Sequence, residues 1–424
     1  MNSLKSLQHY DRIVYWVKTI SLTGLMQVIV QILGFLCGIL VIRLLSMQEY
    51  ALYTLANTML GTMTVLADGG IYTGVMAEGG KVWKNPEKLG AVLVTGLDLR
   101  RKFAIGSLII SIPILLYLLL DNGASWFSAI LITLSIIPAF YAFLSDSLLE
   151  IVPKLHQSIF PLQKNEVSVA SYRLILSTLT LFIFPWAFLA ILASGLTRLY
   201  GNFELKKISQ NFVLIPKSPD SEIRKEILKV VKRVLPGAIF YSLSGQLTIW
   251  LIAVFGTTSS IAELGAIGRL AMLLSVFSSL FSTLLIPRFA RLKDDSSLLL
   301  KQFILALGLL LLVCVLVIGV FLVFSEEVLW LLGNNYSDLT NELILSVVGS
   351  CIGLFTALIF SLSSSRGWVL NPYLYISVSL IAIITGILFF DISSLNGVLV
   401  FNIFISAIQA IMYLLYTFFK IKKG

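Results

Sequence analysis

The chain alternates between long apolar runs and short stretches that carry most of its charge. A helix of about 20 apolar residues crosses the roughly 30 Å hydrocarbon core of a bilayer. The runs indicate helices, since the period-2 alternation of outer-membrane strands is absent. Twelve spans are predicted: Leu22–Ile42, Tyr50–Ile71, Phe103–Leu120, Trp126–Leu144, Leu174–Phe184, Trp186–Leu199, Gly237–Phe255, Leu264–Ile286, Phe303–Phe324, Leu343–Ser363, Tyr373–Phe390 and Val398–Phe419.

The stretches between the spans are alternately basic and not basic. Lys and Arg near span ends are retained in the cytoplasm during insertion, so the basic stretches mark the inner side. The even number of crossings then places both termini there, in a multi-pass protein of the cytoplasmic (inner) membrane. The basic stretches are Lys5–Lys18, Lys81–Lys102, Lys154–Arg173, Arg198–Arg233, Arg288–Lys301, Arg366 and Lys420–Lys423.

Composition supports the membrane assignment. Apolar residues make up 58% of the chain and charged residues 12%, against about 25% charged residues in soluble domains. The net charge of +9 lies in the inner stretches, where orientation explains it, so no nucleic-acid partner is predicted. No phosphate-binding loop or metal-ligand spacing occurs. We expect no cofactor, and no enzyme activity, because the longest outer segment, Ser325–Glu342, is too short for a catalytic domain.

The hydropathy pattern divides the chain into two similar halves. Residues 1–200 and 236–424 each hold six spans, and residues 201–235 form a cytoplasmic linker. An even number of spans per half means that both halves insert the same way up, as a parallel repeat. Within the linker, Ser221–Val234 has helical amphipathic spacing, which predicts a helix in the headgroup plane. A regulatory or partner-docking helix is the alternative.

Few ionisable groups fall inside the spans, and such groups are functional candidates by default. Arg43 and Arg269 are the only cations predicted in the outer half. They either line a cavity that holds an anionic group or extend to the outer headgroups. Asp68 precedes Gly69-Gly70 near the inner side. It is either a gate or ion-coupling residue, or a polar residue at a helix end.

Amides and one indole ring mark the first span of each half. Gln27 and Gln31 share a helix face, and Gln246 and Trp250 lie on the seventh span. These side chains suit a sugar's hydroxyls and ring faces, or else hydrogen-bond between helices. Lys18, at the cytoplasmic mouth of the first span, either collects an anionic headgroup or serves only as an orientation signal.

Three sequence elements resemble those of polysaccharide-type (Wzx-like O-antigen) flippases, members of the multidrug/oligosaccharidyl-lipid/polysaccharide exporter superfamily. Residues 42–53, Ile-Arg-Leu-Leu-Ser-Met-Gln-Glu-Tyr-Ala-Leu-Tyr, resemble the first outer turn. Residues 68–71, Asp-Gly-Gly-Ile, resemble the second-span D-x-G element. The stretch 264–290 is similar to the eighth span.

The resemblance implies two six-helix bundles around a central cavity that opens alternately to each side. The implied substrate is a polyprenyl-diphosphate-linked oligosaccharide, flipped to the outer leaflet for O-antigen, lipopolysaccharide, capsule or exopolysaccharide synthesis. Its diphosphate would be held by Arg43 and Arg269. The implied surroundings are membrane lipids, with a glycan polymerase and a chain-length regulator as candidate partners.

Three other functions compete with flipping. A cation-coupled multidrug exporter of the same superfamily would favour a carboxylate in the cavity. A major-facilitator-type transporter would also give six plus six spans, but its Arg-rich loop after the second span is not found. An integral-membrane glycan polymerase would need an outer catalytic loop, which the sequence does not show.

Overall fold

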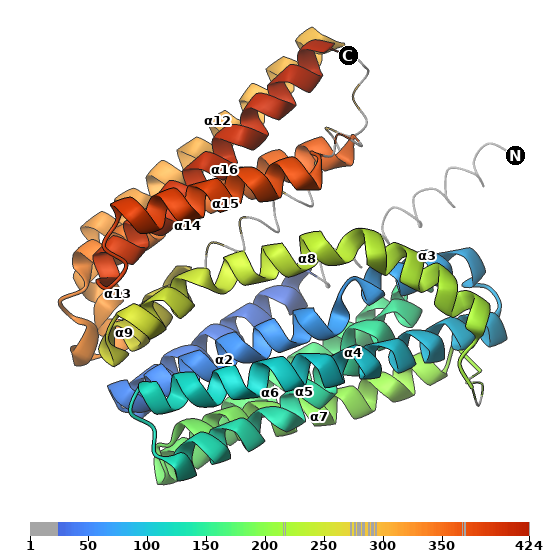
Figure 1. Cartoon of the computed structure of the whole chain (residues 1–424), viewed down its shortest axis with the longest axis horizontal. Coiled ribbons are helices and arrows are strands. Elements are labelled where there is room, and N and C mark those ends of the chain that lie inside the picture. Colours follow the sequence, from blue (N-terminus) through green and yellow to red (C-terminus); the bar gives the residue numbers. More distant parts are fainter. Residues whose placement is uncertain are drawn as a thin grey trace, which may run out of the picture. The chain divides into compact units, whose positions relative to one another are not determined.

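The protein is all-α, and each predicted span except the eighth lies in a helix over most of its length (Figure 1). The computed structural model describes residues 24–423, apart from 215, 217, 367, 369 and much of 272–294. Eight described helices are long and apolar enough to cross a membrane. The prediction of an all-α polytopic membrane protein is confirmed. The helices are Gly24–Leu44, followed by α2 (Met47–Asp68), α3 (Ile71–Val82), α4 (Pro86–Asp121), α5 (Trp126–Leu155), α6 (Ile159–Ile183), α7 (Ala187–Gln210), α8 (Ser221–Phe255), α9 (Thr258–Ala271), α12 (Ser296–Val323), α13 (Ser325–Leu332), α14 (Thr340–Ser365), α15 (Pro372–Phe389) and α16 (Leu395–Lys423).

Several helices extend further toward the predicted cytoplasmic side than their apolar runs. Helix α4 begins at Pro86 rather than Phe103, and α6 begins at Ile159 rather than Leu174. The two predicted spans therefore lie inside longer helices. A helix needs apolar side chains only across the hydrocarbon core, and its backbone hydrogen bonds continue through the charged turns beyond it. The predicted eighth span is covered only at its start by α9, and most of its remainder lies outside the described residues.

The chain forms two compact units. The first contains residues up to 44, 56–117 and 125–239. Within it, α5 packs along α7, and α6 packs along α7 as well (Figure 1). A Cβ added at Gly195 of α7 would lie 3.0 Å from the backbone nitrogen of Ala139 on α5. The small residue thus permits the close approach typical of helix pairs in membranes.

The predicted amphipathic segment is not a separate helix at the membrane surface. It is the first part of α8, which runs without a break from Ser221 through Pro236 to Phe255. Its apolar residues Ile227 and Val231 are buried in a core cluster of the first unit, together with residues of α3, α4 and α5. The prediction of a separate helix in the headgroup plane is wrong, because protein rather than lipid covers this apolar face.

The second unit contains residues 45–55, 118–124 and 240–424. Its helix α14 packs against α16, with α12 and α15 also in the bundle (Figure 1). The buried hydroxyls of Ser363 on α14 and Thr417 on α16 lie 2.6 Å apart and share a hydrogen bond. Three of the boundaries between the units fall inside α2, α4 and α8, and the other two fall between helices. The division of the chain at residues 201–235 stays a prediction.

Candidate functional site

The first unit holds a cavity of about 510 Å³ that is lined by both charged and apolar side chains. Such a volume lies within the roughly 300–1,000 Å³ typical of small-ligand pockets. Helices α2, α3, α4, α5 and α7 supply its wall. The lining residues are Thr64, Val65, Asp68, Tyr72, Arg100, Phe143, Leu144, Asp146, Ser147, Glu150, Lys154 and Arg198.

Asp68 ends α2 and holds the turn that leads into α3. Its carboxylate accepts hydrogen bonds from the backbone N–H groups of Gly70 (3.2 Å) and Tyr72 (3.1 Å). Gly69 and Gly70 have φ of 50° and 93°, a left-handed conformation that glycine adopts without steric cost. Asp68 therefore serves as a polar residue at a helix end, and whether it also gates or couples ions stays a prediction.

The same carboxylate forms an ion pair with Arg100 of α4. The Arg100 guanidinium is buried, and its Nη1 also donates to Ser147 Oγ (2.7 Å) and to the carbonyl oxygen of Leu144 (3.2 Å) on α5. No described residue accepts a hydrogen bond from the buried Arg100 Nε. This guanidinium therefore joins α2, α4 and α5 and keeps one donor without a described acceptor.

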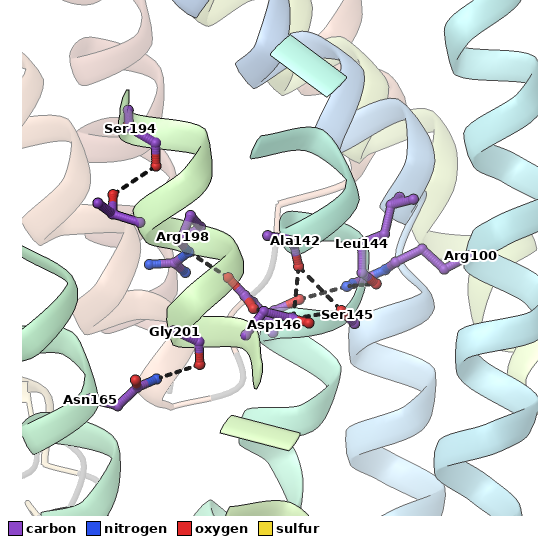
Figure 2. A network of polar contacts seen from close by, with 12 residues as sticks. Arg100, Ala142, Leu144, Ser145, Asp146, Asn165, Ser194, Arg198 and Gly201 are labelled. Carbon is purple, nitrogen blue, oxygen red and sulfur yellow. Dashed lines mark hydrogen bonds and ion pairs between the residues drawn. The ribbon is translucent and has the colours of Figure 1, made fainter. Parts of the chain in front are cut away.

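A second ion pair joins α5 to α7 (Figure 2). The buried Asp146 carboxylate binds Nε of Arg198 and accepts a hydrogen bond of 2.5 Å from Asn202 Nδ2. Asn202 also donates to Ser145 Oγ at 2.6 Å. No described residue accepts a hydrogen bond from the two terminal amino groups of Arg198, whose guanidinium carbon lies 5.0 Å from the centre of the Phe143 ring. Arg198 is thus held by one nitrogen while it lines the cavity.

The charges that line the cavity cancel. Three carboxylates (Asp68, Asp146, Glu150) face three cations (Arg100, Lys154, Arg198), and each belongs to one ion pair. Glu166 lines only a smaller neighbouring cavity. No group of three or more metal-ligating side chains occurs in the part of the chain that the structure describes. The cavity therefore offers many hydrogen-bond donors and acceptors with little net charge.

The other predicted site residues are divided between the two units. Arg43, which is exposed, and Gln27 and Gln31 belong to the first unit, on helix Gly24–Leu44. The second unit contains Arg269, which is half-buried on α9 beside the Tyr50 hydroxyl, and also Gln246 and Trp250 on α8. Lys18 lies outside the described residues. A shared cavity for these side chains stays a prediction.

Sequence reasoning found Asp68 but missed Arg100, Asp146 and Arg198. Both arginines belong to the basic stretches that predict the cytoplasmic side, although Arg198 also lies inside the predicted sixth span, Trp186–Leu199. A signal was present for Asp146, since the apolar pattern continues past it from Leu144 to Val152. Carboxylates such as Asp146 and Glu150 within a continuing apolar helix are costly to bury and mark functional candidates.

Solved membrane transporters share this fold. An inward-facing multidrug resistance MATE family transporter of the MOP superfamily has a TM-score of 0.73 at 14% identity, over 93% of this chain and 95% of that chain. An outward-facing multidrug resistance MATE family transporter has 0.66 at 16% identity, over 95% and 94% of the two chains. A MOP superfamily transporter from Pyrococcus furiosus, for which reversed binding-pocket polarity suggests a different function, has 0.63 at 15% identity, over 94% of each chain.

No model of a known protein family and no curated protein matches the sequence. At 14–16% identity, the structural likeness establishes the fold alone. We conclude that the chain has the helical fold of the MATE transporters of the MOP superfamily.

Proposed function

We propose that this protein is an alternating-access transporter that flips a polyprenyl-diphosphate-linked oligosaccharide from the inner to the outer leaflet of the cytoplasmic membrane. The observation that supports a transport function is the fold, which this chain shares with a MOP-superfamily transporter over 93% of its length. The sequence elements at residues 42–53, 68–71 and 264–290 support the polysaccharide branch of that superfamily.

The physics of the substrate explains why a protein is needed. Each hydroxyl moved unpaired into hydrocarbon costs several kcal/mol, so a sugar chain cannot cross the bilayer unaided. A polar path through the protein removes this penalty while the lipid tail stays in the membrane. With the cell interior negative, outward movement of two negative charges releases roughly 4–5 kcal/mol at 100 mV. The diphosphate needs cations, and Arg43 and Arg269 are those predicted in the outer half.

Multidrug export is the second candidate, because the solved structures that share this fold include multidrug transporters. The reversed pocket polarity noted for the Pyrococcus furiosus transporter shows that the fold carries pockets of unlike chemistry. The side chains of the site must therefore decide between the two functions.

Replacement of the two outer arginines separates the candidates. In a strain that lacks its own copy of the gene, we expect Arg43→Ala/Arg269→Ala to abolish surface glycan, since nothing then holds the diphosphate. Lys225→Ala, which removes an exposed cation paired with Glu222 on α8, should keep it. Immunoblots for surface glycan and growth with cationic drugs provide the readouts. Drug sensitivity with unchanged glycan would establish the exporter instead.

A further inference from the structure

The cavity of the first unit has a charge balance that discriminates between ligands. A diphosphate is best held by an excess of cations, and a cationic drug by an excess of carboxylates, because each is attracted by opposite charge. Here the three carboxylates and three cations are paired with one another. A charged ligand would meet groups whose charge is already largely neutralised by a partner in the cavity wall. The balance therefore favours a neutral, polar ligand.

The hydrogen-bonding groups of the cavity suit hydroxyls, which both donate and accept. Arg198 offers two terminal amino groups without a described acceptor, and its Nε is fixed by Asp146. Buried Arg100 Nε has no described acceptor either. Carboxylate oxygens and the hydroxyl of Ser147 supply acceptors nearby. An array of mixed donors and acceptors of this kind matches a polyhydroxylated molecule.

The cavity also has aromatic walls. The Phe143 ring lies against Arg198, which restricts the guanidinium, and Tyr72 contributes a second ring. Apolar and aromatic surface with a few oriented polar groups is the usual composition of a small-molecule site. The flat C–H faces of sugar rings are well suited to such rings.

The depth of the cavity fits the side on which glycans are attached to lipid carriers. Asp146 lies 20 residues from the start of α5 at Trp126 (146 − 126), which is about 30 Å along a helix. This is roughly the full thickness of the hydrocarbon core. Helix α5 begins with Trp126 at the predicted outer side, so the cavity lies near the inner headgroups.

We propose that this cavity of the first unit binds the neutral sugar portion of the substrate on the cytoplasmic side, before translocation. The inference rests on the proposed function and deepens it. It assigns the glycan to the side chains around Asp146, Arg198 and Arg100, and leaves the diphosphate to other cations. Arg198 is the residue that contacts the sugar hydroxyls most directly.

Direct binding tests the assignment. The purified full-length protein in nanodiscs is titrated with the free oligosaccharide released by mild acid from the host's own polyprenyl-linked fraction. Inorganic diphosphate and ethidium are the comparison probes. Leu144→Trp fills the cavity, and Arg198→Lys keeps the charge but loses the planar fork of donors. We expect oligosaccharide binding to weaken at least tenfold in each variant.

Matched controls lie on the same helices. Ile137→Trp adds an equal ring at an exposed position of α5, and Lys207→Arg exchanges cations in the exposed pair with Glu204 on α7. Both should bind as the unaltered protein does. A readout without variants is acetylation of Lys154, which lines the cavity. The oligosaccharide should protect Lys154 and leave exposed Lys207 reactive.

Several outcomes would overturn the assignment. One is that both cavity variants bind the oligosaccharide as tightly as the unaltered protein does. Another is that the oligosaccharide leaves the reactivity of Lys154 unchanged. The third is that the cavity variants weaken binding of diphosphate or ethidium instead. If those results came with loss of surface glycan in Arg43→Ala/Arg269→Ala, the flippase function would stand without this site. If instead the oligosaccharide bound in the cavity but deletion of the gene left surface glycan unchanged, the flippase function would fail alone.

Discussion

Asp146 and Arg198 form a buried ion pair, and its loss should lower the stability of the protein as well as its binding of oligosaccharide. The Asp146 side chain is 4% exposed and that of Arg198 is 31% exposed. Removal of one partner of a buried pair costs about 3–5 kcal/mol, because the other charge is left without compensation. Since water reaches part of Arg198, we expect Asp146→Ala to lower the free energy of unfolding by about 3 kcal/mol. A lowered Tm of the purified protein would report the loss.

A double variant separates stability from function. Asp146→Leu/Arg198→Leu removes both charges together, and apolar replacement of a buried pair is often neutral. Its Tm should return close to that of the unaltered protein, while oligosaccharide binding stays lost. An unchanged Tm in Asp146→Ala would show that the pair does not hold α5 against α7.

At the residue scale, the sequence identified the ionisable side chains that are costly to bury only where they interrupt or end an apolar run. Asp68 precedes two glycines at the end of a long apolar run, and the structure places it at a helix end. This is one of the two alternatives that the sequence predicts. Its partner Arg100 is 32 residues away. No local pattern identifies which of many basic residues folds back onto it.

Packing of α5 against α7 gives a prediction at the scale of elements. Gly195→Val should push the helices apart, since even a Cβ there would meet Pro138 Cβ at 3.1 Å. Overpacking of this kind costs about 1–3 kcal/mol. Gly106→Val on α4, where nothing lies within 4 Å, should be tolerated. The measurement is Tm together with the yield of monodisperse protein, and equal values for the two variants would contradict the close contact.

The order and approximate position of the helices could be predicted from the sequence, because length and hydropathy of a span are local properties. The turn at Phe184-Pro185-Trp186 is an example, since α6 ends at Ile183 and α7 begins at Ala187. The course of α8 could not be predicted in this way. Its amphipathic start suits lipid headgroups and a protein core equally well, and only its contacts with α3, α4 and α5 decide between them.

At the scale of the whole molecule, the charge asymmetry predicts which ends of the helices face the cytoplasm. A single cysteine at position 422 (Lys422→Cys) should react with an impermeant maleimide only after the inner membrane is opened. Asp338→Cys, in the predicted outer segment between α13 and α14, should react in intact cells. The natural cysteines Cys37, Cys314 and Cys351 are buried and should contribute little. Labelling of position 422 in intact cells would reverse the predicted orientation.

The sequence by itself determined that this is an all-helical membrane protein, where its spans lie and which way they are expected to insert. Apolar length and the placement of Lys and Arg act locally, through the cost of burying charge and backbone in lipid. Only the tertiary structure decided that Asp68 meets Arg100 and that Asp146 meets Arg198 across 52 residues. Helix packing selects those partners, and it gathers charges scattered along four helices around one cavity in which they balance.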